Sequence, residues 1–122
     1  MTRKKFSIKD RIKSFEYAFR GLLLFFKEEH NARIHFELAI IAILLAYALQ
    51  ISIIEWIAVI LCIILVFAAE LINTAIERLC DKIEPNLDSD IAEIKNLAAA
   101  AVLIISIGVA IVGILIFLPK MI

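Results

Sequence analysis

The chain has 122 residues, of which 63% are hydrophobic, and its 13 basic and 13 acidic side chains leave no formal net charge. An ordinary soluble domain is only about 45–50% apolar. A chain this short and this apolar cannot cover its surface with polar side chains, which excludes a soluble globular protein. The composition therefore predicts one integral membrane domain over residues 1–122.

The N-terminal segment has an apolar face and a basic face. Its apolar residues recur every three or four positions, at Ile8, Ile12, Phe15, Phe19, Leu22, Leu23 and Phe26. Lys and Arg fill the opposite face, which is typical of a helix lying on an anionic membrane surface. We expect such a helix over 6–29. A nucleic-acid site is not expected, because the basic positions are interleaved with apolar ones and three hydrophobic segments follow.

The stretch from Leu38 to Ala69 has Glu55 as its only charge. As one helix it would be about 48 Å long, which exceeds a hydrocarbon core of about 30 Å. Two spans are therefore expected, over 32–51 and 53–74, with a turn near Gln50–Ser52. The second helix should continue into water as far as residue 84. This division places Glu70 and Asn73 at the membrane boundary.

Polar residues then separate the second span from a third. Pro85 should end the helix, and the residues after it are typical of a loop: Asn86, Asp88, Ser89 and Asp90. Residues 97–118 carry no charge and are long enough for the third span. The predicted fold class is all-α, with three transmembrane helices and an N-terminal amphipathic surface helix.

The basic residues predict the orientation of these spans. Nine of the 13 lie in the first 33 positions, three lie between the second and third spans, and none lies at 50–55. The positive-inside rule then places the N-terminus and the 78–96 segment in the cytoplasm and the C-terminus outside. The polar residues at the end of the second span thus face the side that contains ATP.

Those polar residues form a stripe. At 100° per residue Glu70, Asn73, Glu77 and Asp81 fall within about 80° of one another on a helix. Acidic residues fused to a membrane span usually carry function. The stripe is suited to holding a divalent cation and a polyphosphate. Carboxylates from Glu28 or Glu29 together with Glu77 would suit one Mg²⁺, and Lys95 could reach a phosphate as a point charge.

The stripe is open to other interpretations. Ordinary solvation of an emerging helix explains Glu77 and Asp81, but not Glu70, which follows 14 apolar residues. A small oligomeric channel or transporter subunit with a ring of carboxylates is the alternative function, and a structural scaffold is a third. His30 and His35 are five positions apart, a poor spacing for metal ligands on a helix.

The segment from Glu70 to Asp81 closely resembles the hallmark segment of the prokaryotic diacylglycerol kinase family, small trimeric membrane lipid kinases. The resemblance extends to Tyr17 with Gly21, to the approach to the first span from Glu29 to Arg33, and to the small residues after Lys95. It implies a homotrimer in the bacterial cytoplasmic membrane that phosphorylates a lipid hydroxyl with ATP and Mg²⁺. Small residues at 98–101 and the stripe itself also favour packing against further copies.

The resemblance also implies roles for individual residues. Glu70 would be the general base on the lipid hydroxyl, with Asn73 beside the transferred phosphoryl group. Glu29 and Glu77 would bind the metal of the nucleotide. The expected nucleotide contacts are Tyr17, Glu29, Glu77, Asp81, Lys95 and Asn96, and the expected lipid contacts are Glu70 and Ala99.

The chain departs from the family pattern at three positions. Asn96 stands where an acidic residue is common, so it cannot orient Lys95 by charge. Cys80 replaces an aliphatic residue, and Asp10 stands where some relatives carry a basic nucleotide contact. The sequences around Ser52–Trp56 and Ile116–Lys120 look like the Gram-positive branch, which phosphorylates undecaprenol. The residues themselves leave undecaprenol and diacylglycerol both open.

Overall fold

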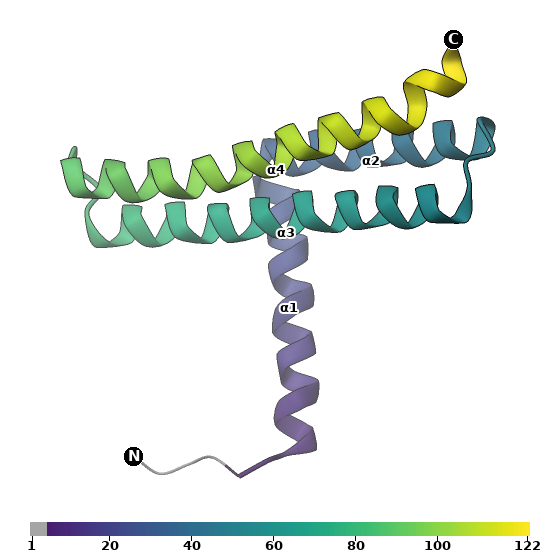
Figure 1. Cartoon of the computed structure of the whole chain (residues 1–122). Helices are drawn as coiled ribbons and strands as arrows, with labels where there is room; N and C mark the ends of the chain where they lie inside the picture. Colours follow the sequence, from purple (N-terminus) through teal and green to yellow (C-terminus); the bar gives the residue numbers. More distant parts are fainter. Residues whose placement is uncertain (1–4) are drawn as a thin grey trace. The chain divides into compact units, whose positions relative to one another are not determined.

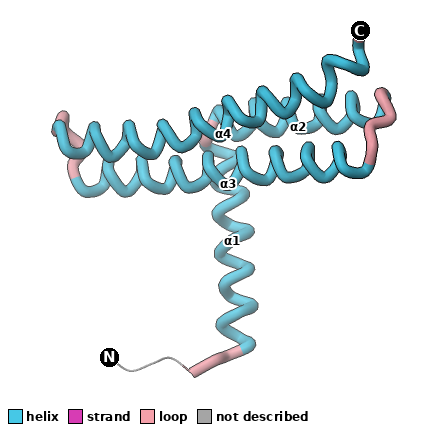
Figure 2. The backbone as a smooth tube through the Cα atoms, viewed as in Figure 1, coloured by secondary structure: helices cyan, strands magenta, loops and turns pink. Residues whose placement is uncertain are grey.

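The computed structural model describes residues 5–122, and within that range it contains four helices and no strand (Figure 2). The helices are α1 (Ile8–Glu28), α2 (His30–Ala48), α3 (Ile53–Ile83) and α4 (Ser89–Met121). The all-α fold class is thereby confirmed. The chain divides into two compact units, one up to Arg33 and one from Ile34 to the C-terminus.

The first unit consists mainly of α1, whose two ends are capped. The Ser7 side chain accepts a hydrogen bond from the backbone N–H of Asp10, which satisfies one of the free donors of the first turn. At the other end Arg33 donates to the carbonyls of Phe26 and Lys27, at 3.2 and 2.7 Å. The apolar side chains of α1 remain exposed, as Phe15 (69%) and Phe19 (65%) illustrate. A capped helix with an uncovered apolar face fits the expected position on a membrane surface.

The second unit contains the long apolar helices, and α2, α3 and α4 are each long and apolar enough to cross a membrane. The 31 residues of α3 measure about 46 Å at 1.5 Å per residue, more than a hydrocarbon core of about 30 Å. One end of α3 must therefore project beyond the apolar layer. Figure 1 shows α3 and α4 running side by side, so their polar ends are neighbours.

The turn between α2 and α3 is held by local hydrogen bonds and by packing. Gln50 adopts a left-handed backbone conformation with φ of 51°, and Ser52 and Glu55 form a reciprocal capping box at the start of α3. Lys120 of α4 lies 3.4 Å from Glu55. The buried apolar core of the unit lies at this same end, in residues Ala46, Ile51, Val59 and Ile116. Packing therefore fixes the end of the bundle that lies away from the polar stripe.

The connection between α3 and α4 is shorter than expected. Ser89 and Asp90, which the sequence pattern placed in a loop, form the first turn of α4. The reason is a cap: the Asp88 side chain accepts from the backbone N–H groups of Asp90 and Ile91, at 3.0 and 3.1 Å. The helix begins eight residues before the expected span at 97, so Lys95 and Asn96 stand on a helix beside the end of α3.

Candidate active site

The polar stripe on α3 contains an internal hydrogen bond. The Asn73 side-chain nitrogen donates to Glu77 Oε1 at 3.1 Å, as the spacing of four residues on a helix allows. The other atom of the amide, Asn73 Oδ1, is buried and has no hydrogen-bond partner among residues 5–122. A buried oxygen without a donor is costly. As an acceptor, this oxygen can bind a hydroxyl, an amine or a cation.

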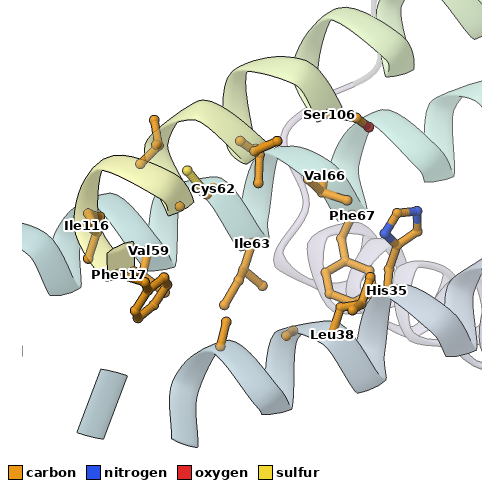
Figure 3. A pocket seen from close by; sticks show the side chains of 16 residues that line it. His35, Leu38, Val59, Cys62, Ile63, Val66, Phe67, Ser106, Ile116 and Phe117 are labelled. Carbon is orange, nitrogen blue, oxygen red and sulfur yellow. The ribbon is translucent and has the colours of Figure 1, made fainter. Parts of the chain in front are cut away.

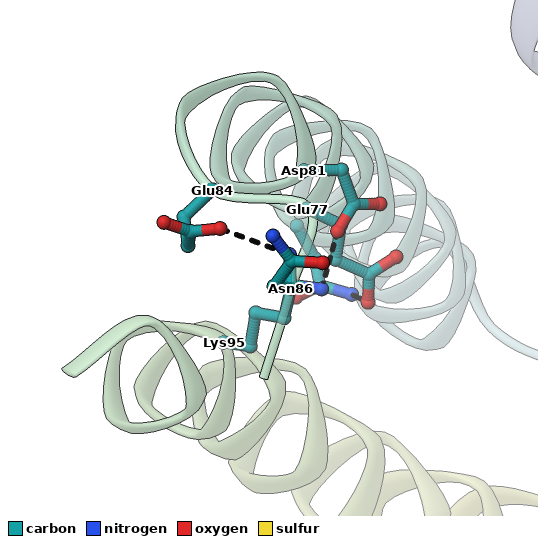
Figure 4. A network of polar contacts seen from close by, with 6 residues as sticks. Glu77, Asp81, Glu84, Asn86 and Lys95 are labelled. Carbon is teal, nitrogen blue, oxygen red and sulfur yellow. Dashed lines mark hydrogen bonds and ion pairs between the residues drawn. The ribbon is translucent and has the colours of Figure 1, made fainter. Parts of the chain in front are cut away.

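A second polar contact joins α3 to α4, and Figure 4 shows it beside Glu77. The Lys95 ammonium lies 2.5 Å from Asp81 Oδ1. Lys95 lies before the charge-free segment of α4. The hydrogen bond that its ammonium donates to Asp81 raises the pKa of Lys95 above the ordinary value. Asp81 thus supplies from α3 the orienting charge that Asn96 lacks. Asn96 and Ala99 are exposed on α4.

The pairing predicts the effect of removing the Asp81 charge. In Asp81→Asn, Lys95 loses the partner that orients it, so we expect the KM for ATP to rise about 3- to 10-fold, equivalent to roughly 0.7–1.4 kcal/mol. The melting temperature should hardly change, because exposed ion pairs contribute little to stability. Steady-state kinetics at saturating lipid measure the effect, and Glu93→Gln, at an exposed acid on α4, is the matched control. An unchanged KM would mean that Lys95 needs no orientation from Asp81.

Glu70 has a partner on α2 that the sequence did not reveal. Its side chain is 9% exposed, and Oε1 lies 3.1 Å from Nε2 of His35, itself 22% exposed. The ring of Phe67, one turn before Glu70, meets the His35 ring edge-on at a centroid distance of 6.5 Å. The sequence pattern alone gives His35 no role beyond that of a poorly spaced metal ligand. The 35 positions that separate the pair leave no local signal, since only the packing of α2 on α3 brings the two side chains together.

His35 also lines an apolar cavity of about 280 Å³ between α2, α3 and α4 (Figure 3). Its other lining residues are almost all aliphatic or aromatic, and Ser106 and Cys62 are the exceptions besides His35. Glu70 does not line the cavity. The imidazole is thus the polar group that α2 contributes to the cavity lining, and it also makes the hydrogen bond to Glu70.

The remaining expected site residues belong to the other unit. Tyr17 is 62% exposed on α1, and Glu29 is the C-cap of that helix. Among residues 5–122 no group of three or more His, Cys, Asp and Glu side chains is placed to hold a metal ion. The structure therefore brings together Asn73 with Glu77 and Asp81 with Lys95 within one unit. A metal site made by Glu29 and Glu77 stays a prediction.

The fold has three long apolar helices, and carboxylates, an amide and a lysine lie where the apolar runs end. These features define an integral membrane protein with a charged site at the edge of its spans. Residues 16–117 match the family model described as prokaryotic diacylglycerol kinase, and the chain belongs to this family. It is 37% identical over 109 residues to the undecaprenol kinase of Bacillus subtilis (strain 168), covering 89% of each chain. It is 35% identical over 109 residues to the diacylglycerol kinase of Synechocystis, covering 88% of this chain and 62% of that protein. The protein is accordingly a lipid kinase.

Proposed function

We propose that the protein transfers the γ-phosphoryl group of ATP to the hydroxyl of a membrane lipid alcohol, and that undecaprenol is the acceptor. The observation that carries the proposal is the buried Glu70 carboxylate, which stands one helical turn from Asn73 at the end of an apolar run. A lipid hydroxyl resides at the membrane interface, and ATP approaches from water. A base for this reaction must therefore stand where the apolar and polar parts of α3 meet.

The reaction that this arrangement supports is a direct transfer. The lipid hydroxyl oxygen forms a bond to the γ-phosphorus, the bond from that phosphorus to the bridging oxygen of ADP breaks, and the hydroxyl proton passes to the Glu70 carboxylate. Positioning and neutralisation of charge supply most of the catalysis in phosphoryl transfer. Asn73 would hold the phosphoryl group, and Lys95 would offset negative charge on the nucleotide.

The residues present fit a magnesium ion. Mg²⁺ prefers oxygen ligands and usually takes one or two carboxylates together with phosphate oxygens. Glu77 offers such a carboxylate, and the unpaired Asn73 Oδ1 marks a place beside it that lacks a positive or donating partner. Glu77 and Glu29 would hold the ion, which when bound neutralises charge on the phosphates of ATP. Tyr17 would contact the nucleotide.

Undecaprenol is favoured over diacylglycerol by the similarity to the undecaprenol kinase, which extends over 89% of both chains. Diacylglycerol is the second candidate, because a relative of nearly the same identity is named a diacylglycerol kinase. Either lipid presents a hydroxyl to Glu70. The acceptor must therefore be decided by measurement.

The deciding experiment supplies both lipids to the purified protein in mixed micelles with γ-labelled ATP and Mg²⁺, and separates the products by thin-layer chromatography. We expect labelled undecaprenyl phosphate to form at a higher kcat/KM than labelled phosphatidic acid. The reverse order would make diacylglycerol the acceptor. Transfer to neither lipid, together with ion flux in loaded vesicles, would favour the carboxylate-ring channel instead.

The location follows from the same proposal. The protein would lie in the bacterial cytoplasmic membrane with its N-terminus and the α3–α4 connection in the cytoplasm and its C-terminus outside. The basic residues concentrated in the first 33 positions support this orientation. A membrane-impermeant thiol reagent added to intact cells should then label a cysteine added after Ile122, and it should not label a cysteine introduced at position 86.

A homotrimer with active sites shared between subunits is part of the proposal. Large apolar side chains remain exposed along α3 and α4, for example Ile64 (54%) and Leu103 (59%), and lipid or further copies must cover them. If Glu29 and Glu70 of one site come from different subunits, an inactive Glu70→Gln chain mixed with an inactive Glu29→Gln chain should regain part of the activity. Mixed trimers isolated with two affinity tags provide the measurement. No recovery in such trimers would favour sites within one subunit.

A further inference from the structure

The hydrogen bond between His35 and Glu70 points to a role for a residue outside the set that the sequence analysis assigned to the site. The two side chains come from α2 and α3, their polar atoms are 3.1 Å apart, and the carboxylate is nine-tenths buried. The ring of Phe67 meets the imidazole edge-on at a centroid distance of 6.5 Å. The imidazole therefore has an aromatic neighbour as well as its hydrogen bond to Glu70.

The direction of this hydrogen bond follows from the proposed chemistry. A carboxylate that is to accept a proton must be ionised, and an ionised carboxylate only accepts hydrogen bonds. The imidazole must then donate through its Nε2–H. A buried polar group without a hydrogen-bond partner is costly. The His35 donor thus gives the Glu70 carboxylate a partner and fixes the position of its Oε1.

No other residue near His35, among those that the structure describes, makes a hydrogen bond to the Glu70 carboxylate. Among the residues that line the adjoining cavity, α3 contributes one titratable side chain, Cys62, and α4 contributes the polar side chain of Ser106 but no titratable group. On the stripe, the Asn73 amide nitrogen is engaged with Glu77. His35 is the side chain that the structure places within hydrogen-bond distance of the Glu70 carboxylate.

We propose that His35 is a positioning residue that holds the Glu70 carboxylate in one orientation toward the lipid hydroxyl. The proposal rests on the proposed lipid kinase reaction, with Glu70 as its base. The imidazole does not touch the phosphoryl group and takes no proton from the lipid. It acts through the carboxylate, so its loss should be seen in kcat rather than in the KM for ATP.

Three substitutions at position 35 separate this role from simple packing. Leu removes the donor, Asn places its amide near the Nδ1 position of the imidazole, and Gln places its amide nitrogen near the Nε2 position. We expect His35→Leu and His35→Asn to lower kcat about 10-fold or more, with the KM for ATP changed less than about 3-fold. His35→Gln should retain most of the activity. Ser106→Ala, at another polar residue of the cavity, should leave the rate unchanged.

The comparison of His35→Gln with His35→Asn adds a signature that packing cannot produce. Both substitutions introduce an amide, and only Gln brings its donor to the Nε2 position. We therefore expect kcat in His35→Gln to exceed kcat in His35→Asn by about 10-fold. Full activity in His35→Leu, or equal rates in His35→Gln and His35→Asn, would overturn the proposal. Should His35→Leu fail to fold, the comparison of the two amide variants still decides.

A measurement without turnover separates this inference from the proposed function. In the ¹⁵N-labelled protein in detergent, the Nε2 chemical shift of His35 at a fixed pH should differ between Glu70→Gln and the wild type, and should be the same in Glu93→Gln as in the wild type. Identical chemical shifts in all three would overturn the His35–Glu70 contact itself. If the chemical shifts differ but no lipid is phosphorylated, the contact stands and the proposed function fails, together with the positioning role that rests on it.

Discussion

Replacing Glu70 by Gln should lower kcat by about 10²-fold or more while the affinity for ATP stays within a few-fold of the wild type. The substitution keeps the size of the side chain and removes its ability to accept a proton. A lipid hydroxyl is a weak nucleophile, so a positioned base contributes chiefly to the transfer step. The buried carboxylate and its hydrogen bond to His35 make Glu70 the group best placed for that task.

Single-turnover kinetics in mixed micelles, combined with equilibrium binding of a non-hydrolysable ATP analogue, measure the two effects separately. Glu93→Gln makes the same chemical change at an exposed position on α4 and should behave as the wild type. If Glu70→Gln lost nucleotide binding but transferred phosphate normally at saturation, Glu70 would be a ligand of the nucleotide or its metal. The base would then have to be another residue of the stripe.

The sequence was sufficient to predict the fold class, because the length of the apolar stretches relative to the thickness of a bilayer sets the number of spans. A run of 32 residues with one charge is too long for one span and requires a turn, and the structure has that turn between Ala48 and Ile53. The hydrogen bond from Asn73 to Glu77 could likewise be anticipated, since both residues lie one turn apart on one helix. Periodicity within a single helix is readable without knowing how helices pack.

Contacts between helices were not predictable in the same way. The pairing of His35 with Glu70 depends on the register of α2 against α3, and that of Asp81 with Lys95 on the register of α3 against α4. No local pattern encodes these registers. The resemblance assigned Asp81 and Lys95 to the nucleotide separately, whereas the structure joins them to each other.

The start of α4 was missed for a different reason. Asp and Ser favour both turns and helix N-caps, because their short side chains hydrogen-bond to nearby backbone N–H groups. Asp88 was therefore interpreted as part of a loop, although it caps a helix. The consequence for the site is favourable, since two extra helical turns hold Lys95 against Asp81 instead of leaving it on a mobile connection.

Replacing Glu77 by Gln should abolish turnover at about 1 mM Mg²⁺, mainly through loss of the metal. The amide keeps the size of the side chain but removes its charge, and it also changes the acceptor of the Asn73 hydrogen bond. Loss of a group that merely supports a metal ligand lowers metal affinity about 10- to 100-fold, so loss of a ligand should do at least as much. Raising the Mg²⁺ concentration should recover part of the rate if Glu29 still holds the ion.

The measurement is the rate as a function of Mg²⁺ at fixed ATP, in Glu77→Gln, Glu29→Gln and the control Glu93→Gln. A shift of the Mg²⁺ dependence in the first two and not in the control assigns both carboxylates to the metal. Full activity of Glu77→Gln at low Mg²⁺ would remove Glu77 from the metal site. A low rate that no Mg²⁺ concentration improves would instead place Glu77 with Asn73, as a residue that orients the amide toward the transferred phosphoryl group.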